Sequence, residues 1–109
     1  MLKIERIRMS ALEGVELLEE VSLEMEKQSK MGNEKETDRL GSIADKIGHA
    51  LKEANSYQAF STYRDSLDNM LALRGMEDKL RDFEKRMSEE DREYRKAKAV
   101  LEGKTIYVV

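Results

Sequence analysis

The hydrophobic residues of this chain recur mostly at intervals of three and four, the spacing of one face of an α-helix. The first run begins with Ile4, Ile7 and Ala11 and continues with Leu18, Val21 and Met25. Met31-Gly32-Asn33 ends it, because Gly and Asn tolerate the left-handed backbone that closes many helices. The pattern predicts a helix over residues 1–31. Alternation at Leu2 and Ile4 leaves a short lead-in strand as a second interpretation of residues 2–9.

A second run predicts a helix over residues 34–55, with Asn33 or Thr37 as its N-cap. Its apolar face consists of Leu40, Ile43, Ile47, Ala50, Leu51 and Ala54. Gly14 lies inside the first predicted helix, where Gly costs about 1 kcal/mol relative to Ala. We expect Gly14 to mark the close approach of a neighbouring helix.

The third run has a seven-residue repeat and predicts one long helix over residues 57–102. Its seam resembles the a and d positions of a coiled coil and comprises Leu73, Met76, Leu80, Phe83, Met87, Tyr94, Ala97 and Leu101. Glu90 is the one defect at a d position. Ser88-Glu89-Glu90-Asp91 resembles an N-cap box, but the repeat keeps its phase across it, so we expect a bend there and no break.

Charges beside the seam favour a parallel pair of such helices. In a parallel two-stranded coil each g residue faces the e residue five places on in the partner. The resulting pairs are all complementary: Lys79 with Glu84, Arg86 with Asp91, and Glu93 with Lys98. Two alternatives stay open. The same charges can pair at i, i+4 along a single helix, and the seam can pack on residues 3–30 of its own chain.

The tail at residues 103–109 is rich in β-branched and apolar residues, which is typical of a strand or an extended arm. Gly103 ends the preceding helix, and the side chains that could add to a partner's sheet are Ile106, Tyr107, Val108 and Val109.

Composition supports an all-α fold in a single domain of 109 residues. Charged residues make up 39% of the chain, aromatic residues only 6%, and Pro is absent. The chain has no Cys, no apolar run long enough to cross a membrane and no signal-peptide core, so we expect a cytoplasmic protein. Net charge is −3 and no basic stripe is present, so nucleic acid is not an expected partner. Residues 11–26 carry six Glu and no base, which forms either an exposed face or an acidic docking surface for a basic partner.

Candidate catalytic chemistry is sparse. His49 is the only histidine, and with Asp45 and Glu53 it forms a stripe on one helical face that could hold a divalent metal. A solvated face is the alternative. Nothing near His49 suggests a nucleophile with its base, so we expect no enzymatic activity, no cofactor and no metal.

Part of the chain resembles a family of small helical bacterial regulators. Ala44-Asp-Lys-Ile47, Ala50-Leu-Lys-Glu53 and Tyr57-Gln-Ala-Phe60, with the apolar positions that continue to Met87, are similar to the YlbF, YmcA and YheA family over residues 43–87. The Asp-Pro of that family is replaced by Met70-Leu71. The resemblance implies an all-helical, non-enzymatic protein that acts through protein contacts. It assigns no functional residues.

Together these patterns predict three long helices, the third like a coiled coil, followed by a short extended tail. The predicted function is that of an interaction or assembly protein, either a helical subunit or a small regulator of a larger complex, with a protein partner or a second copy in a parallel dimer. A membrane-surface module of the BAR type is one alternative, although no basic face supports it. A nucleic-acid-associated factor is another alternative. It would use the basic side chains near the end of the last helix: Arg92, Arg95, Lys96 and Lys98.

Overall fold

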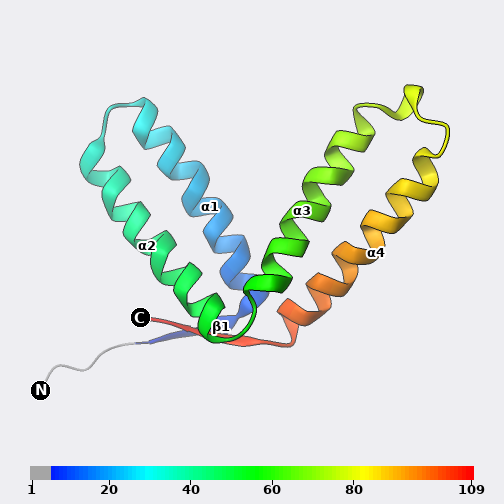
Figure 1. Cartoon of the computed structure of the whole chain (residues 1–109). Helices are drawn as coiled ribbons and strands as arrows, with labels where there is room; N and C mark the ends of the chain where they lie inside the picture. Colours follow the sequence, from blue (N-terminus) through cyan, green and yellow to red (C-terminus); the bar gives the residue numbers. More distant parts are fainter. Residues whose placement is uncertain (1–5) are drawn as a thin grey trace, which may run out of the picture.

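The computed structural model describes residues 6–109 and shows two helical hairpins that diverge from a shared base like the arms of a V (Figure 1). The first hairpin consists of α1 (Ala11–Lys30) and α2 (Glu34–Glu53), and the second of α3 (Tyr57–Arg74) and α4 (Phe83–Glu102). The Cα radius of gyration is 16.9 Å, well above the value of about 13 Å expected for a compact domain of this size. The arms are therefore held apart.

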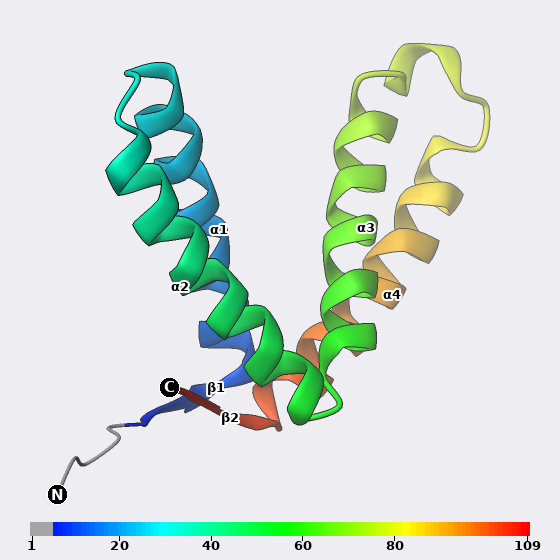
Figure 2. The same ribbon diagram turned by 60° about the vertical axis from the view of Figure 1, so that its left-hand side comes forward.

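A two-stranded antiparallel sheet joins the ends of the chain at the base of the V (Figure 2). Strand β1 (Ile7–Ser10) precedes α1 and strand β2 (Thr105–Val108) follows α4, with Ile7 opposite Val108 and Ser10 opposite Thr105. The tail is therefore a strand, but it pairs with its own chain. The preferred prediction of helix over residues 1–10 is wrong for Ile7–Ser10, where the lead-in strand is observed. Residues 1–5 lie outside the described part.

The first strand ends where a capping box begins α1. Ser10 accepts a hydrogen bond from the Glu13 N–H at 3.1 Å, and the Glu13 carboxylate accepts one from the Ser10 N–H at 3.3 Å. This arrangement satisfies two of the N–H groups that every helix start leaves without a partner. Asn33 caps α2 by accepting from the Glu36 N–H at 3.3 Å, which confirms the first of the two N-caps considered. Asn55 has φ 54°, and this left-handed residue turns the chain from one hairpin into the other.

The predicted single helix over residues 57–102 is wrong, because the chain reverses direction in its middle. Helix α3 ends at Arg74, a single 3₁₀ turn (η1, Glu77–Lys79) follows, and α4 starts at Phe83. Of the predicted seam only Leu73 lies in α3, and Met76 and Leu80 lie in the connection, so the repeat is mainly the apolar stripe of α4. The Ser88 box lies within an unbroken α4. The described residues thus form four α-helices and a small sheet, where three helices and an extended tail were predicted.

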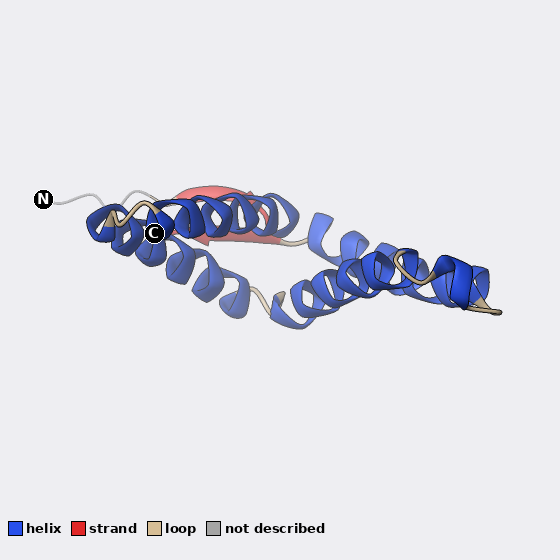
Figure 3. Ribbon diagram, turned by 90° about the horizontal axis from the view of Figure 1, so that it is seen from above, coloured by secondary structure: helices blue, strands red, loops and turns tan. Residues whose placement is uncertain are grey.

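Most of the hydrophobic core lies at the base, where both hairpins and the sheet meet. It includes residues from every α-helix and from β2: Ala11, Val15, Ile47, Ala50, Leu51, Phe60, Tyr63, Ala97, Leu101, Ile106 and Val108. Further out each arm is only two helices thick, and the whole molecule measures 63 × 37 × 14 Å (Figure 3). Leu23 and Leu71, one in each arm, are more than 60% exposed. The arms therefore leave apolar side chains without cover.

Gly14 does mark a close approach, but the neighbour is a strand and not a helix. A Cβ built on Gly14 would overlap the Cδ1 of Ile106 in β2 and lie 3.7 Å from the Met9 sulfur. The absence of a side chain at Gly14 therefore lets the sheet rest directly on α1.

Candidate interaction surfaces

The predicted seam lies largely inside the second hairpin. Ala97 and Leu101 are buried, and Leu80, Phe83, Met87 and Tyr94 are half-buried. The ring of Tyr94 stacks on Tyr63 of α3, with 4.9 Å between the ring centroids. Leu73 is buried near the end of α3, whereas Met76 is 42% exposed in the turn. The alternative in which the seam packs within the chain therefore describes most of these residues, with α3 as the neighbour instead of residues 3–30.

Two of the six charges that flank the seam, Arg86 and Asp91, pair with residues of their own hairpin. Arg86 contacts Asp82 at 3.0 Å and Arg95 contacts Asp91 at 2.8 Å, both four residues apart. Lys79 lies in η1 and Glu84 lies in α4, so the first of the three predicted interchain pairs spans the break between helices. Glu93 is exposed and Lys98 is half-buried. A continuous parallel coil over residues 73–101 would need this hairpin to unfold.

The tail residues divide between the two sides of the sheet. Ile106 and Val108 are buried in the base, whereas Tyr107 is 50% and Val109 is 58% exposed. This alternation is the period of two that a strand imposes. Only part of the predicted interaction tail is therefore open to a partner.

One candidate site is the cleft between the arms, here called the V cleft. It is a hollow of about 590 Å³ that receives side chains from three helices. Helix α1 contributes Leu18, Glu19, Ser22, Leu23 and Glu26; α2 contributes Ala44, Asp45 and Gly48; and α3 contributes Tyr57, Phe60 and Arg64. The helical period places these residues on one side of each helix, because each set recurs at intervals of three and four.

The aromatic side chains of the V cleft contact each other and two neighbouring basic side chains. Tyr57 and Phe60 meet edge to face at 5.7 Å between centroids. The Lys52 ammonium lies 5.1 Å from the Tyr57 ring centre, and the Arg64 guanidinium lies 5.5 Å from that of Phe60. Such cation–π contacts at exposed sites each contribute about 0.5–1 kcal/mol. The cleft thus presents two aromatic rings in mutual contact beside the exposed Leu23.

The rim of the V cleft is acidic. Glu19, Glu26 and Asp45 line it against a single base, Arg64. Two of these acids belong to the run of six Glu over residues 11–26, for which an acidic docking surface was one interpretation. The apolar residues of the cleft were not recognised as a site in the sequence, because their helical spacing is the same as that of core residues.

Tyr63 lies in α3 near the base of the molecule, where carboxylates of α1 affect the pKa of its hydroxyl. Burial raises the pKa of the Tyr63 hydroxyl well above its usual range, and the neighbouring Tyr94 hydroxyl adds to the shift. Glu19 and Glu16 of α1 raise this pKa further. Negative charge on α1 therefore reaches across to α3 at the base of the V cleft.

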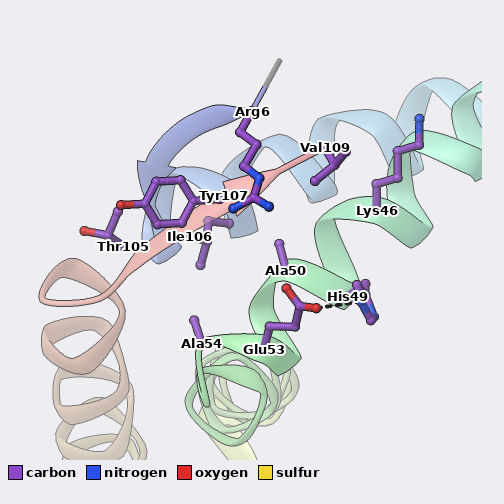
Figure 4. Close-up of a pocket in the computed structure, with 10 residues that line it drawn as sticks. All are labelled: Arg6, Lys46, His49, Ala50, Glu53, Ala54, Thr105, Ile106, Tyr107 and Val109. Atoms are coloured by element: carbon purple, nitrogen blue, oxygen red, sulfur yellow. Dashed lines mark ion pairs between the residues drawn. The ribbon is translucent and has the colours of Figure 1, made fainter. Parts of the chain in front are cut away.

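A second hollow, of about 500 Å³, lies beside the sheet and is here called the β2 groove (Figure 4). One wall is β2 with Val109, and the other is the C-terminal half of α2, from Lys46 onward, with its C-cap Ala54. Arg6 reaches over β2, while His49 and Glu53 project from α2, with the His49 Nε2 2.9 Å from a Glu53 carboxylate oxygen. Across residues 6–109, no three His, Asp or Glu side chains come together in a way that could hold a metal ion, so the Asp45, His49 and Glu53 stripe does not form such a site.

Comparisons with models of protein families, with curated proteins and with solved structures give no match to this chain. The similarity to the YlbF, YmcA and YheA family stays a prediction. Within residues 6–109, no helix combines the length and the apolar character that crossing a membrane requires.

Proposed function

We propose that this chain is a non-enzymatic interaction protein, a helical subunit or small regulator of a larger complex, that holds a helix of its partner in the V cleft. The observation that carries the proposal is the open angle between the two hairpins. Four amphipathic helices usually close into a bundle and bury their apolar stripes against one another. Here the arms meet only at the base, and α1 faces α3 across a hollow.

The apolar floor of the V cleft suits one face of a helix as the occupant. Recognition of a helix in a groove relies on apolar side chains at helical spacing that fill a hydrophobic trough. Phe60 and Leu18 provide a floor of low exposure, and the exposed Leu23 and Tyr57 stand at its sides. A docked helix would cover these side chains and give each two-helix arm a third neighbour.

Charge indicates which kind of helix fits. Glu19, Glu26 and Asp45 line the V cleft, and only Arg64 opposes them. Complementary charges across an interface steer association and select the partner more than they raise affinity. The partner segment is therefore an amphipathic helix with basic residues along the edges of its apolar stripe.

Gly48 allows a direct test, because a Cβ at this position has no atom within 4 Å and the residue lines the V cleft. Gly48→Trp should fold and fill the cleft. A matched control is Ser42→Trp, which puts the same side chain on an exposed position of α2 outside the cleft. Circular dichroism and thermal unfolding establish that both variants keep the fold.

The probes are two labelled peptides of about 18 residues with the same apolar stripe, one with Lys and one with Glu beside it. We expect the basic peptide to bind the protein and the Ser42→Trp variant equally, and the Gly48→Trp variant at least tenfold more weakly by fluorescence anisotropy. Equal binding of both peptides, or binding that Gly48→Trp leaves unchanged, would contradict the proposal.

A further inference from the structure

The outer edge of β2 is a second surface with unused binding capacity, separate from the V cleft. A two-stranded sheet has two outer edges, and an outer edge carries backbone N–H and C=O groups that no strand pairs. The hydrogen bonds around the sheet show which groups of β2 these are.

The phase of the β1–β2 ladder follows from two hydrogen bonds. The Ala11 N–H donates to the Lys104 carbonyl at 2.8 Å, one step beyond the end of the ladder. In an antiparallel pair, positions that exchange hydrogen bonds alternate with positions that do not. Ile106 and Val108 therefore bond to β1, and the N–H and C=O groups of Thr105 and Tyr107 point away from it. The Ser10 N–H, which donates to the Glu13 carboxylate at 3.3 Å, also points away from β2 as this phase requires.

The residues around the β2 groove show that it runs along the strand edge. Thr105, Ile106 and Tyr107 all line the groove although their side chains alternate between the faces of the sheet. A hollow on one face would be lined by alternate residues only. The opposite wall consists of residues of α2 at helical spacing: Lys46, His49, Ala50, Glu53 and Ala54. A trough between a strand edge and a helix accommodates one extended segment that adds to the sheet.

The outer edge of β1 lacks this combination. At one end the Ser10 N–H is already occupied by Glu13. The β2 edge, which borders a hollow, is therefore the better placed of the two to extend the sheet, and a sheet of two strands gains most from a third.

Charge selects the segment that fits the β2 groove. Arg6 and Lys46 bring positive charge to it, and its one acidic side chain, Glu53, lies 2.9 Å from the His49 ring. This local excess of basic groups stands out in a chain of net charge −3. We propose that the β2 groove binds an extended, acidic segment of another protein as a third strand, with its backbone paired to Thr105 and Tyr107.

The test uses the full chain and two labelled eight-residue peptides, one of alternating Glu and Val and one of alternating Lys and Val. Fluorescence anisotropy at low salt should show binding of the acidic peptide only. Lys46→Glu should weaken this binding by about fivefold, the equivalent of one exposed charge pair. Lys85→Glu is the matched control, because Lys85 is exposed on α4 and lines neither groove, and we expect it to leave the affinity unchanged.

Backbone pairing is tested by hydrogen exchange followed residue by residue. In the free protein the amides of Ile106 and Val108 should exchange slowly and those of Thr105 and Tyr107 fast. Saturating acidic peptide should slow exchange at Thr105 and Tyr107 by at least tenfold. Binding without this protection, or equal binding of the basic peptide, would overturn the proposal. Protection that appears at high protein concentration without peptide would also overturn it, since a second copy would then occupy the edge.

Discussion

Single residues decide how closely the base of the molecule packs. Gly14 lies under Ile106, which is 1% exposed, and a methyl group at Gly14 would overlap that side chain. Gly48 belongs to the same hairpin but opens onto the V cleft with no atom near its missing Cβ. Two helical glycines therefore have opposite roles, one as a contact point and one as part of a hollow.

Replacement of each glycine by alanine should change stability in opposite directions. Gly14→Ala gains about 1 kcal/mol of helix propensity but loses up to about 3 kcal/mol through overpacking, a net loss near 1–2 kcal/mol. Gly48→Ala has no overlap and should stabilise the fold by up to about 1 kcal/mol. Urea unfolding followed by circular dichroism measures both. A stabilising Gly14→Ala would contradict the observed packing of β2 on α1.

Tyr63 should make the fold sensitive to alkali. Its pKa in the folded protein lies above the value of about 10 that an unfolded tyrosine has. The folded state therefore holds this proton more tightly, so the contribution to stability is complete below about pH 10 and declines as the pH rises above it. Urea unfolding between pH 8 and 11 should show this decline, and Tyr63→Phe should reduce it.

Tyr57→Phe is the control for this pH dependence. Tyr57 is 45% exposed and belongs to the same helix as Tyr63. The variant should keep the alkaline decline of the unmodified chain. An identical decline in the Tyr63→Phe variant would show that other groups cause it.

At the scale of elements, periodicity predicted helix type well and helix boundaries less well. The spacing of Leu18, Val21 and Met25 identified α1, and Gly32-Asn33 marked the end of its hairpin turn. The turn at residues 75–82 was missed because it lacks Pro, and because Met76 and Leu80 of the turn happen to continue the seven-residue spacing of α4. β1 was the second choice, since its apolar positions fit both periods and only pairing with β2, nearly 100 residues later in the chain, decides between them.

The site was harder to predict than the helices. The six Glu of residues 11–26 were recognised as a possible docking surface, and two of them, Glu19 and Glu26, do line the V cleft. Leu23 and Phe60 looked like core residues. Whether an apolar stripe is buried depends on the angle between the two hairpins. That angle is set by the packing at the base of the molecule, and the residues of the stripe do not encode it.

The capping box at the junction of β1 and α1 should contribute measurably to stability. Ser10→Ala removes the hydroxyl that accepts from the Glu13 N–H, and we expect a loss of about 1 kcal/mol. Ser22→Ala is the control, because the Ser22 hydroxyl bonds to the Leu18 carbonyl within α1 and caps nothing. Chemical unfolding of both variants should show a loss for Ser10→Ala alone, and equal effects would argue against the cap.

At the scale of the whole molecule, the base holds the two arms apart. The core, the sheet and the turn at Asn55 all lie at one end, so nothing in residues 6–109 clamps the outer ends together. Exposed apolar residues in both arms, Leu23 and Leu71 among them, then remain available to a partner. The open V is the premise of the proposed function.

Small-angle X-ray scattering of the dilute protein tests this premise most directly. An open V predicts a radius of gyration near the Cα value of 16.9 Å and a longest dimension of at least 63 Å. A closed four-helix bundle of the same chain would give a radius of gyration near 13 Å. The larger values would support a cleft that is ready for a helix, and a radius of gyration near 13 Å would contradict it.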